Sequence, residues 1–380
     1  MKNLIGRAEK KAILDVLESG RLSGWYRSLL GGPHLQEFEK RFAHYQRKKY
    51  GIAVTSGTAA VHVSLLACGV GPSQEVLVSP YTHIGSVSPI VMCGAKPIFV
   101  DIEDKTCNID PDHVAKSVTT KSKAIIAAHQ CGYPCDMKAI IEIAEEHGLQ
   151  VIEDVSQALG AEYYGTKLGS LGHLGCFSLG GDMTKSISLG EGGMIVTDDE
   201  KVAEKCRMLR NHGEKYSNAN FLCYNYRISD LQAALGLAQL KKLDYLNRWQ
   251  IRNAEYIVKR IMEDLNFLDP PRLPTKDLKP VYYILVCDYR NDELTRDQFV
   301  QACTENGLNR NLPRRTISTG YPTLIYQIPF YNQYARPCHV AQEKLKTSVW
   351  IDHHRFPITR RDTERLLQGF KKILAARRLS

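Results

Sequence analysis

The chain has 380 residues, of which 43% are hydrophobic and 24% charged, a balance that is ordinary for a soluble globular protein. Its formal net charge is +9, but the basic residues are scattered among 41 acidic ones, and no nucleic-acid-binding motif accompanies them. We therefore expect no nucleic-acid partner and interpret the charge as a basic surface that attracts phosphorylated or nucleotide-linked substrates.

The sequence also predicts where the protein works. It has no apolar run of the roughly 18 residues that a membrane helix needs, and its N-terminus lacks the apolar run of a signal peptide, so we expect a cytoplasmic protein without a membrane partner. Eleven cysteines lie mostly in apolar segments, which suits reduced, buried thiols better than a disulfide framework. The close pair Cys131 and Cys135 lacks a second pair or a histidine at ligand spacing, so we expect no structural metal.

Between about residues 50 and 200, short β-rich runs alternate with helical patterns, which is typical of a mostly parallel sheet flanked by helices. Between the fourth and fifth runs, Met137–His147 has apolar residues at helical spacing and is closed by Gly148, which predicts one βαβ unit. The predicted strands are Gly51–Val54, Glu75–Ser79, Pro97–Asp101, Lys123–His129, Gln150–Asp154 and Met194–Thr197.

The first predicted strand is followed by Thr55-Ser56-Gly57-Thr58-Ala59-Ala60, which opens a helix of small and apolar residues. Free backbone N–H groups and the helix dipole would face an anion there, and the small side chains would let a phosphate approach closely. The alternative interpretation is a plain strand-to-helix turn. The segment lacks the Gly-Lys-Ser/Thr of a Walker loop, and no Gly-x-Gly-x-x-Gly occurs in the context that dinucleotide binding requires.

Asp154 ends the fifth predicted strand, at the edge where ligands bind in open α/β sheets, although it could instead cap the following helix. Three residues on, Gln157 could reach the same ligand. Lys185 follows, five residues before Gly190-Glu191-Gly192-Gly193. A lysine amine and a carboxylate are what pyridoxal phosphate (PLP) needs, because the lysine carries the cofactor as a Schiff base and the carboxylate keeps its pyridine nitrogen protonated. Glu191 has a weaker claim, since such loops are often hairpin connections.

The remainder of the chain predicts a second unit. Ser229-Asp230-Leu231-Gln232 has the form of a capping box and starts a helix with one apolar face. Beyond about residue 247, prolines break the chain into short elements before an amphipathic helix near Asp362–Leu374. We therefore predict a large domain of residues 1–247 and a smaller C-terminal α/β domain of residues 248–380.

Taken together and in this order, these segments resemble the DegT/StrS-type sugar and aminocyclitol aminotransferases, PLP-dependent members of the aspartate-aminotransferase-like superfamily. The resemblance implies that superfamily's α/β fold, with a mostly parallel central sheet flanked by helices and a smaller C-terminal α/β domain. The matching segments are Ser19-Gly20-Arg21-Leu22, Phe38-Glu39, Ser56-Gly57-Thr58-Ala59-Ala60, Gly94-Ala95-Lys96-Pro97, Glu153-Asp154-Val155-Ser156-Gln157-Ala158, Lys185 with Gly190-Glu191-Gly192-Gly193, Arg210-Asn211-His212-Gly213, Tyr224-Asn225-Tyr226-Arg227-Ile228-Ser229-Asp230 and Gln232–Leu240.

The resemblance also implies a role for each matched site residue. Lys185 would form the internal aldimine with PLP and move protons between the substrate Cα and the cofactor's C4′ carbon. Asp154 would pair with the pyridine nitrogen, and Gln157 would contact the 3-hydroxyl oxygen of the ring. Asn225 would reach the phosphate bound by the partner subunit, which implies a homodimer with shared active sites. The other residues that would hold the phosphate are Gly57, Thr58 and Ala59.

Two positions depart from the family pattern. His83 stands where the family usually has an aromatic residue stacked on the cofactor ring, and an imidazole can stack there too. The family's usual phosphate-binding serine lies five residues before the lysine, whereas Ser178 lies seven before it and Gly180 occupies the expected place. A two-residue insertion within Gly180–Met183 would reconcile Ser178 with the phosphate role.

The reaction implied is ping-pong transfer of an amino group from L-glutamine or L-glutamate to a keto-cyclitol or keto-sugar. The long stretch before Phe38 and the segment Val349–His354 are more similar to members that act on keto-cyclitols, although the second segment could be ordinary packing. Two alternatives stay open: a pyridoxamine-phosphate-dependent dehydratase or aromatising enzyme acting on a related keto ring, and a non-catalytic regulatory protein on the same fold. Relatives that dehydrate sugars typically have histidine in place of Lys185, and an intact lysine, aspartate and glutamine set disfavours the regulatory alternative.

Overall fold

The computed structural model describes residues 5–24, 30–181, 185–213, 221–309, 316–352, 354–355 and 357–377. Within these ranges, seven strands form the main sheet in the order β1-β9-β8-β5-β4-β2-β3. The strands from β8 to β3 are parallel, whereas β9 is antiparallel to both of its neighbours, so the mostly parallel sheet predicted from the sequence is confirmed. The strands are β1 (Tyr50–Val54), β2 (Glu75–Val78), β3 (Lys96–Phe99), β4 (Ser122–Ala128), β5 (Gln150–Asp154), β8 (Leu174–Ser178) and β9 (Gly193–Thr197).

Each of the six predicted strands is present, with ends that differ by no more than two residues. The largest difference is at Pro97–Asp101, because β3 ends at Phe99. The sequence did not predict β8. Its apolar run is interrupted by Gly175, where a Cβ would lie 2.2 Å from the carbonyl oxygen of Gly169. Close packing therefore requires glycine at this position, and glycine weakens the strand pattern in the sequence.

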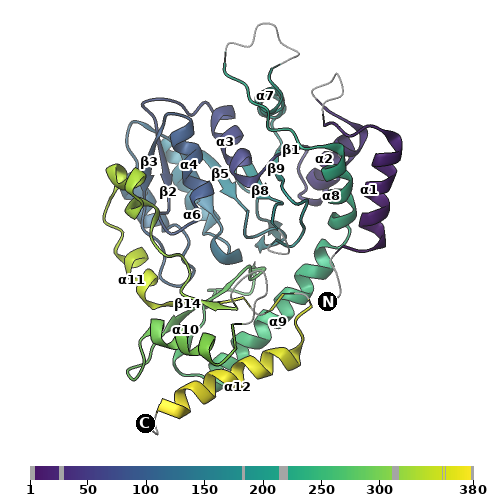
Figure 1. Cartoon of the computed structure of the whole chain (residues 1–380). Coiled ribbons are helices and arrows are strands. Elements are labelled where there is room, and N and C mark those ends of the chain that lie inside the picture. The colour runs from purple at the N-terminus through teal and green to yellow at the C-terminus, as the bar shows by residue number, and fades with distance from the viewer. Residues whose placement is uncertain are drawn as a thin grey trace.

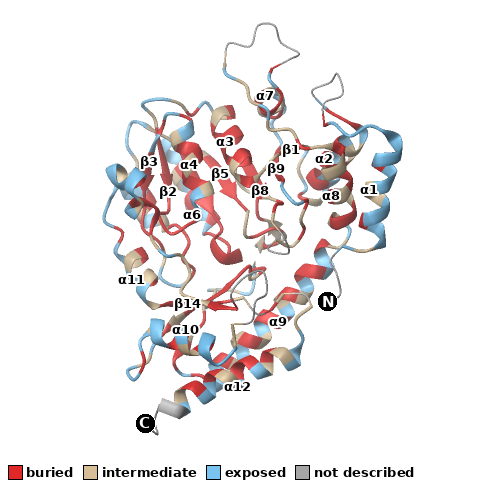
Figure 2. Ribbon diagram, viewed as in Figure 1, coloured by how far each residue is buried: buried red, intermediate tan, exposed pale blue. Residues whose placement is uncertain are grey.

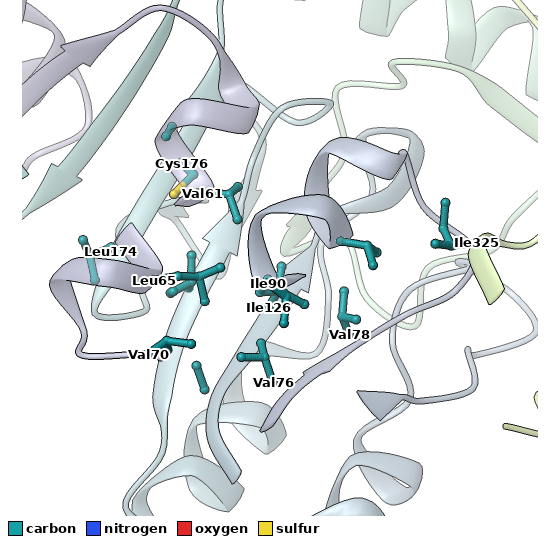
Figure 3. Close-up of a cluster of buried hydrophobic side chains, with 14 of the residues drawn as sticks. Val61, Leu65, Val70, Val76, Val78, Ile90, Ile126, Leu174, Cys176 and Ile325 are labelled. Atoms are coloured by element: carbon teal, nitrogen blue, oxygen red, sulfur yellow. The ribbon is translucent and has the colours of Figure 1, made fainter. Parts of the chain in front are cut away.

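Helices cover both faces of the main sheet because the strand side chains alternate. In β2, Val76 and Val78 pack in one cluster with α3 and α4, whereas Leu77 packs on the other face with α6. Figure 3 shows Val61 and Leu65 of α3 and Ile90 of α4 above Val76, Val78 and Ile126. The covering helices are α3 (Gly57–Ala67), α4 (Ile84–Met92) and α7 (Glu200–Arg210) on the first face, and α2 (Pro33–Tyr45), α5 (Pro111–Ser117), α6 (Met137–His147) and α8 (Asp230–Leu240) on the other.

Local sequence signals set the helix ends. In α6, the Asp136 side chain accepts from the Ala139 N–H and Gly148 ends the helix in the left-handed region at φ +65°, as predicted. The capping box of α8 is confirmed, with Ser229 and Gln232 bonded reciprocally. The predicted last helix is α12 (Arg360–Arg377), and α1 (Arg7–Ser19) packs outside α8.

A second, antiparallel sheet lies below the main sheet in Figure 1, with the order β10-β12-β14-β13. The inner faces of α9, α10 and α12 are buried against it and their outer faces are exposed (Figure 2). The elements of this part are α9 (Leu243–Asp264), β10 (Leu268–Asp269), β11 (Leu278–Lys279), β12 (Leu285–Tyr289), α10 (Arg296–Glu305), β13 (Ile317–Ser318), the 3₁₀ turns Ile325–Gln327 and Pro329–Tyr334, α11 (His339–Thr347), β14 (Ser348–Ile351) and α12. A short sheet of β6 (Glu162–Tyr163), β7 (Thr166–Lys167) and β11 joins the two parts.

The two parts share α9. Leu243 packs in the core under the main sheet, whereas Ile257 and Ile261, further along the same helix, pack in the core of the second sheet. The predicted boundary between residues 247 and 248 falls inside this continuous helix, and the division into two domains stays a prediction. Among the described residues, no helix is both long and apolar enough to cross a bilayer.

The segment Val349–His354 contributes to packing. Val349 and Ile351 are fully buried in the core of the second sheet, and Trp350 packs toward the main sheet. His353 lies outside the described residues. The contacts of β14 therefore match the packing interpretation.

The core of the first face offers a stability test. Leu65 of α3 is fully buried, so Leu65→Ala should lower the free energy of unfolding by about 2–5 kcal/mol through lost transfer energy and an unfilled cavity. Leu14→Ala on α1 is the matched control, because that side chain is 54% exposed. Urea denaturation of both variants measures the difference, and equal midpoints would contradict the packing described for α3.

Candidate active site

A cavity of about 360 Å³ opens at the carboxyl ends of the parallel strands, the edge where ligands bind in open α/β sheets. All predicted site residues except Ala59 and Asn225 line it. They come from the ends of different strands, because consecutive parallel strands bring their carboxyl ends to one edge. The predicted residues in the lining are Gly57 and Thr58 after β1, His83 after β2, Asp154 and Gln157 at the end of β5, Ser178 at the end of β8, and Lys185.

The turn from β1 into α3 is packed too tightly for a side chain at Gly57, within the turn, or at Gly193, the first residue of β9, which packs against the turn. A Cβ on Gly57 would lie 2.7 Å from the Ser178 Cβ, and a Cβ on Gly193 would lie 2.2 Å from the carbonyl oxygen of Ser56. The Ser56 hydroxyl accepts from the Ala59 N–H at 3.1 Å, so this amide already has a partner, and Ala59 itself is buried. The turn thus presents Gly57 and Thr58 to the cavity from the N-terminal end of a helix, which favours an anion, and Ser178 lines the cavity beside them from the end of β8.

Asp154 is 6% exposed, and each of its carboxylate oxygens has a defined partner. Oδ2 accepts from the Ser86 hydroxyl at 2.7 Å and Oδ1 accepts from the Ser156 N–H at 3.0 Å. A carboxylate oxygen can accept more than one hydrogen bond. The group is therefore held in one orientation while it retains capacity to accept from a ligand in the cavity.

The neighbouring carboxylate, Glu153, is fully buried on the other side of β5. It accepts from His129 Nε2 at 3.1 Å and from the backbone N–H groups of Gly169, Leu171 and Gly172 at 2.7–2.8 Å. His129 Nδ1 accepts from the Cys135 N–H at 3.1 Å, so the ring hydrogen is on Nε2 and points at Glu153. Burial alone would raise the pKa of Glu153, but the hydrogen bonds from His129 and the backbone outweigh it and hold the pKa below 4.5.

The Lys185 amine reaches into the turn that follows β5. Nζ donates to the Ser156 carbonyl oxygen at 2.6 Å and lies 4.7 Å from the centre of the Tyr283 ring. The sequence-distant lysine, the Asp154 carboxylate and the Gln157 amide thus meet at one cavity. Asp182 and Met183, where the insertion before Lys185 was predicted, lie outside the described residues.

Three further predicted residues have clear positions. The Gln157 Oε1 accepts from the Cys131 N–H at 2.7 Å, and its Nε2 donates to the Tyr321 hydroxyl at 3.1 Å. His83 caps α4, and its Nδ1 accepts from the Gly85 N–H at 3.0 Å. Asn225 is exposed, lies outside the cavity lining and forms an isolated bridge with Asn211.

Several lining residues were not predicted. Ser86, His129, Gln130 and Tyr283 carry no motif of their own in the sequence, and Tyr283 comes from beyond the predicted domain boundary. His129 had one usable signal, because it ends a predicted strand at the same sheet edge as Asp154. Cys131 and Cys135 are buried, free thiols.

Comparison with known proteins decides the family. The family model described as the DegT/DnrJ/EryC1/StrS aminotransferase family matches residues 4–369. The chain belongs to this family. It is 43% identical over 239 residues to the GDP-perosamine synthase of Caulobacter vibrioides, an alignment that spans 62% of each protein.

Solved structures confirm the predicted fold. The aminotransferase from Psychrobacter cryohalolentis matches with a TM-score of 0.88 at 31% identity and covers 98% of both chains. The structure of ntda from Bacillus subtilis, described with bound cofactor PMP, matches with a TM-score of 0.85 at 26% identity, over 98% of this chain and 83% of that one. As a member of this family, the chain is a PLP-dependent aminotransferase, which is the enzyme class and the cofactor predicted from the sequence.

The lowered pKa of Glu153 gives a pH-dependent prediction. Because the folded pKa is below 4.5, the ionised carboxylate stabilises the fold above that pH, and the contribution is lost as pH falls through the lowered folded pKa. Glu153→Gln turns an amide toward backbone donors and should cost about 3 kcal/mol at neutral pH. Denaturation midpoints should differ most at neutral pH and converge in acid.

The control is Glu142→Gln on α6, whose side chain is 63% exposed in a surface pair with Lys138. It should change the midpoint little at any pH. A Glu153→Gln deficit that is the same at neutral and acid pH would show that the ionised carboxylate does not carry the stabilisation.

Proposed function

We propose that this chain transfers an amino group from L-glutamine or L-glutamate to the keto group of a sugar or cyclitol, with PLP carried on Lys185. The observation that supports this most strongly is the position of the Lys185 amine, which donates to Ser156 within the turn from Asp154 to Gln157. The Lys185 amine meets the buried Asp154 carboxylate and the Gln157 amide there at one cavity, although the lysine follows them only after a further strand, β8.

The shape and polarity of the cavity fit PLP. The N-terminus of α3 presents Gly57 and Thr58 with Ser178 beside them, and no Cβ fits at Gly57, which suits a phosphate lying close to the backbone. Ala59 does not line the cavity and would support this turn through its bond to Ser56. Asp154 is held by Ser86 and Ser156 at the far side of the cavity, where it would accept from the protonated pyridine nitrogen. His83 lies on the loop between β2 and α4 and would cover a face of the ring.

PLP, when bound, supplies an electron sink and carries the amino group between the two substrates. The Lys185 amine would take the proton from Cα of the amino donor and return a proton to the carbon that receives the amino group. Asp154 would keep the pyridine nitrogen protonated, and its burial would strengthen that pairing. Gln157 would donate to the 3-oxygen of the ring.

Asn225 would act across a dimer. Its side chain is exposed and outside the cavity of its own chain, so the role implied by the family pattern requires the active site of a second copy. We therefore propose a homodimer in which each site takes Lys185 from one subunit and Asn225 from the partner.

A keto-sugar is the substrate class with the most support. The alignment with a GDP-perosamine synthase points to nucleotide-linked sugars, and a chain of net charge +9 attracts anionic substrates. The family pattern keeps keto-cyclitols in the same proposal. The amino donor is identified by testing whether L-glutamine or L-glutamate supports amino transfer to a keto-sugar.

The lysine assignment is tested by chemical trapping. The purified protein is incubated with PLP, reduced with borohydride, digested and analysed by mass spectrometry, and we expect cofactor mass on the peptide that contains Lys185. Lys185→Ala should lose that adduct and slow amino transfer by at least about a thousandfold. Lys138→Ala, at a side chain 77% exposed on α6, is the control and should keep both. Adduct on another lysine would contradict the assignment.

The reaction class is tested by initial rates with a donor and a keto-sugar acceptor. Because the amino group rests on the enzyme between the two substrates, double-reciprocal lines should be parallel, and the donor alone should release its 2-oxo acid in proportion to the enzyme. Intersecting lines, or a deoxygenated product without amino transfer, would argue against the proposal.

The shared site is tested by mixing two inactive variants. A dimer of one Lys185→Ala subunit and one Asn225→Ala subunit contains one site with both native residues, so random mixing after unfolding and refolding should restore about a quarter of the native activity. If Asn225 acted within its own chain, mixing would restore none.

A further inference from the structure

The turn that holds Gln157 is reached by a side chain from the C-terminal part of the chain, Tyr321. We infer that Tyr321 is a positioning residue: its hydroxyl fixes the amide of Gln157 and so couples the second sheet to the cofactor pocket. Tyr321 is not part of the cavity lining, so it would act through Gln157 and not by touching substrate. The inference rests on the proposed function, because it takes the ring of PLP as the group that Gln157 contacts.

The Gln157 amide has only one consistent orientation. A backbone N–H can only donate, so the atom that faces the Cys131 N–H at 2.7 Å must be Oε1. Nε2 then faces the Tyr321 hydroxyl, to which it donates at 3.1 Å. An amide NH₂ group has two hydrogens, and the second is available to an acceptor in the cavity that Gln157 lines. Tyr321 and Cys131 together thus turn Gln157 into a hydrogen-bond donor toward the ligand.

The backbone partner of Gln157 is held in an uncommon conformation. Cys131 has φ +55°, a left-handed geometry that non-glycine residues adopt only when their surroundings enforce it. The Cys131 carbonyl accepts from the Ile284 N–H at 3.3 Å, and the next carbonyl, of Gly132, accepts from the Val281 N–H at 3.1 Å. The segment that leads into β12 therefore holds the Cys131 end of the amide, as Tyr321 holds the other.

A second amide fixes the Tyr321 hydroxyl from another side. Gln130 Nε2 donates to it at 2.8 Å, and Gln130 lines the cavity. The hydroxyl thus accepts from two amides that follow two neighbouring strands, β4 and β5. Burial raises the pKa of Tyr321, which keeps the hydroxyl neutral and available as an acceptor for both.

The Tyr321 ring is anchored to the second sheet. It packs edge-to-face on Tyr81 with ring centres 5.4 Å apart and on Trp350 of β14 with centres 4.9 Å apart. The Trp350 indole donates to the Tyr81 hydroxyl at 3.3 Å. Gly320, at φ +79°, leaves the space that Trp350 occupies, because a Cβ there would lie 2.5 Å from the indole nitrogen. A shift of β14 would therefore move the Tyr321 hydroxyl relative to Gln157.

The chemistry gives the sign of the effect. A donor at the 3-oxygen of PLP stabilises the form of the bound cofactor that has lost a proton, so weakening this donor should raise the pKa at which the visible absorbance of bound PLP changes. Tyr321→Phe keeps the ring and its packing but removes the hydroxyl. We expect the absorbance midpoint to move up by about half to one pH unit and the Kd for PLP to rise about tenfold.

The matched control is Tyr326→Phe. Its hydroxyl accepts from Gln342 at 3.2 Å and its ring packs edge-to-face on Phe99, so it loses a comparable hydrogen bond away from the cavity. Melting temperatures of both variants without cofactor separate a loss of stability from a loss of cofactor control. The control should keep the native absorbance midpoint and the native Kd for PLP.

A double-mutant cycle tests whether Tyr321 acts through Gln157. Adding Tyr321→Phe to Gln157→Met should shift the absorbance midpoint no further, because the positioned amide is already gone. Additive shifts, or a Tyr321→Phe variant with the native midpoint and the native Kd, would overturn the inference. If the native protein itself showed no PLP absorbance, the proposed function would be wrong. Failure of the inference appears only in the variants, so the two outcomes are distinguishable.

Discussion

One buried carboxylate, Glu153, ties together the three elements whose ends form the floor of the cavity. It binds His129 after β4, belongs to β5 itself, and accepts from three backbone N–H groups in the loop that leads to β8. Ionised and without solvent, such a group is tolerated only when its hydrogen-bonding capacity is filled. The backbone ladders set the spacing of β4, β5 and β8, and Glu153 adds to them by fixing the end of β4 and the loop before β8 to the middle strand.

Strand alternation gives consecutive acids separate tasks. Because successive side chains of a strand point to opposite faces, Glu153 is directed to the buried loop and Asp154 to Ser86 and the cavity. The structural carboxylate thereby orients the next residue along the chain without contacting the ligand. The Ser156 backbone also makes two contacts at the site: its N–H donates to Asp154, and its carbonyl accepts from Lys185.

Much of this arrangement is visible in the sequence, for reasons that are local. Strand runs, the capping box at Ser229 and the glycine after α6 act over a few residues, and the parallel order then brings Asp154 and the turn at Gly57 to one edge. The strand β8 could not be predicted from the sequence, because Gly175 is required by close packing on the Gly169 backbone and not by a local strand pattern. Tyr283 and Tyr321 could not be predicted either, because they reach the site through packing of the second sheet. Asn225 is a different case, because its predicted role involves a second copy of the chain.

The close contact of Gly193 with Ser56 also has a consequence for the time at which the coenzyme can be captured. The turn that would receive the phosphate is built early in the chain, but it is completed by β9, which pairs with β1 across a long stretch of intervening sequence. Chains emerge from the ribosome N-terminal end first, and such distant pairings form only after their loop-closure entropy has been met. The nascent N-terminal third therefore lacks the strand that packs on Ser56, and the turn at Gly57 is complete only after residues 193–197 have been synthesised and paired with β1.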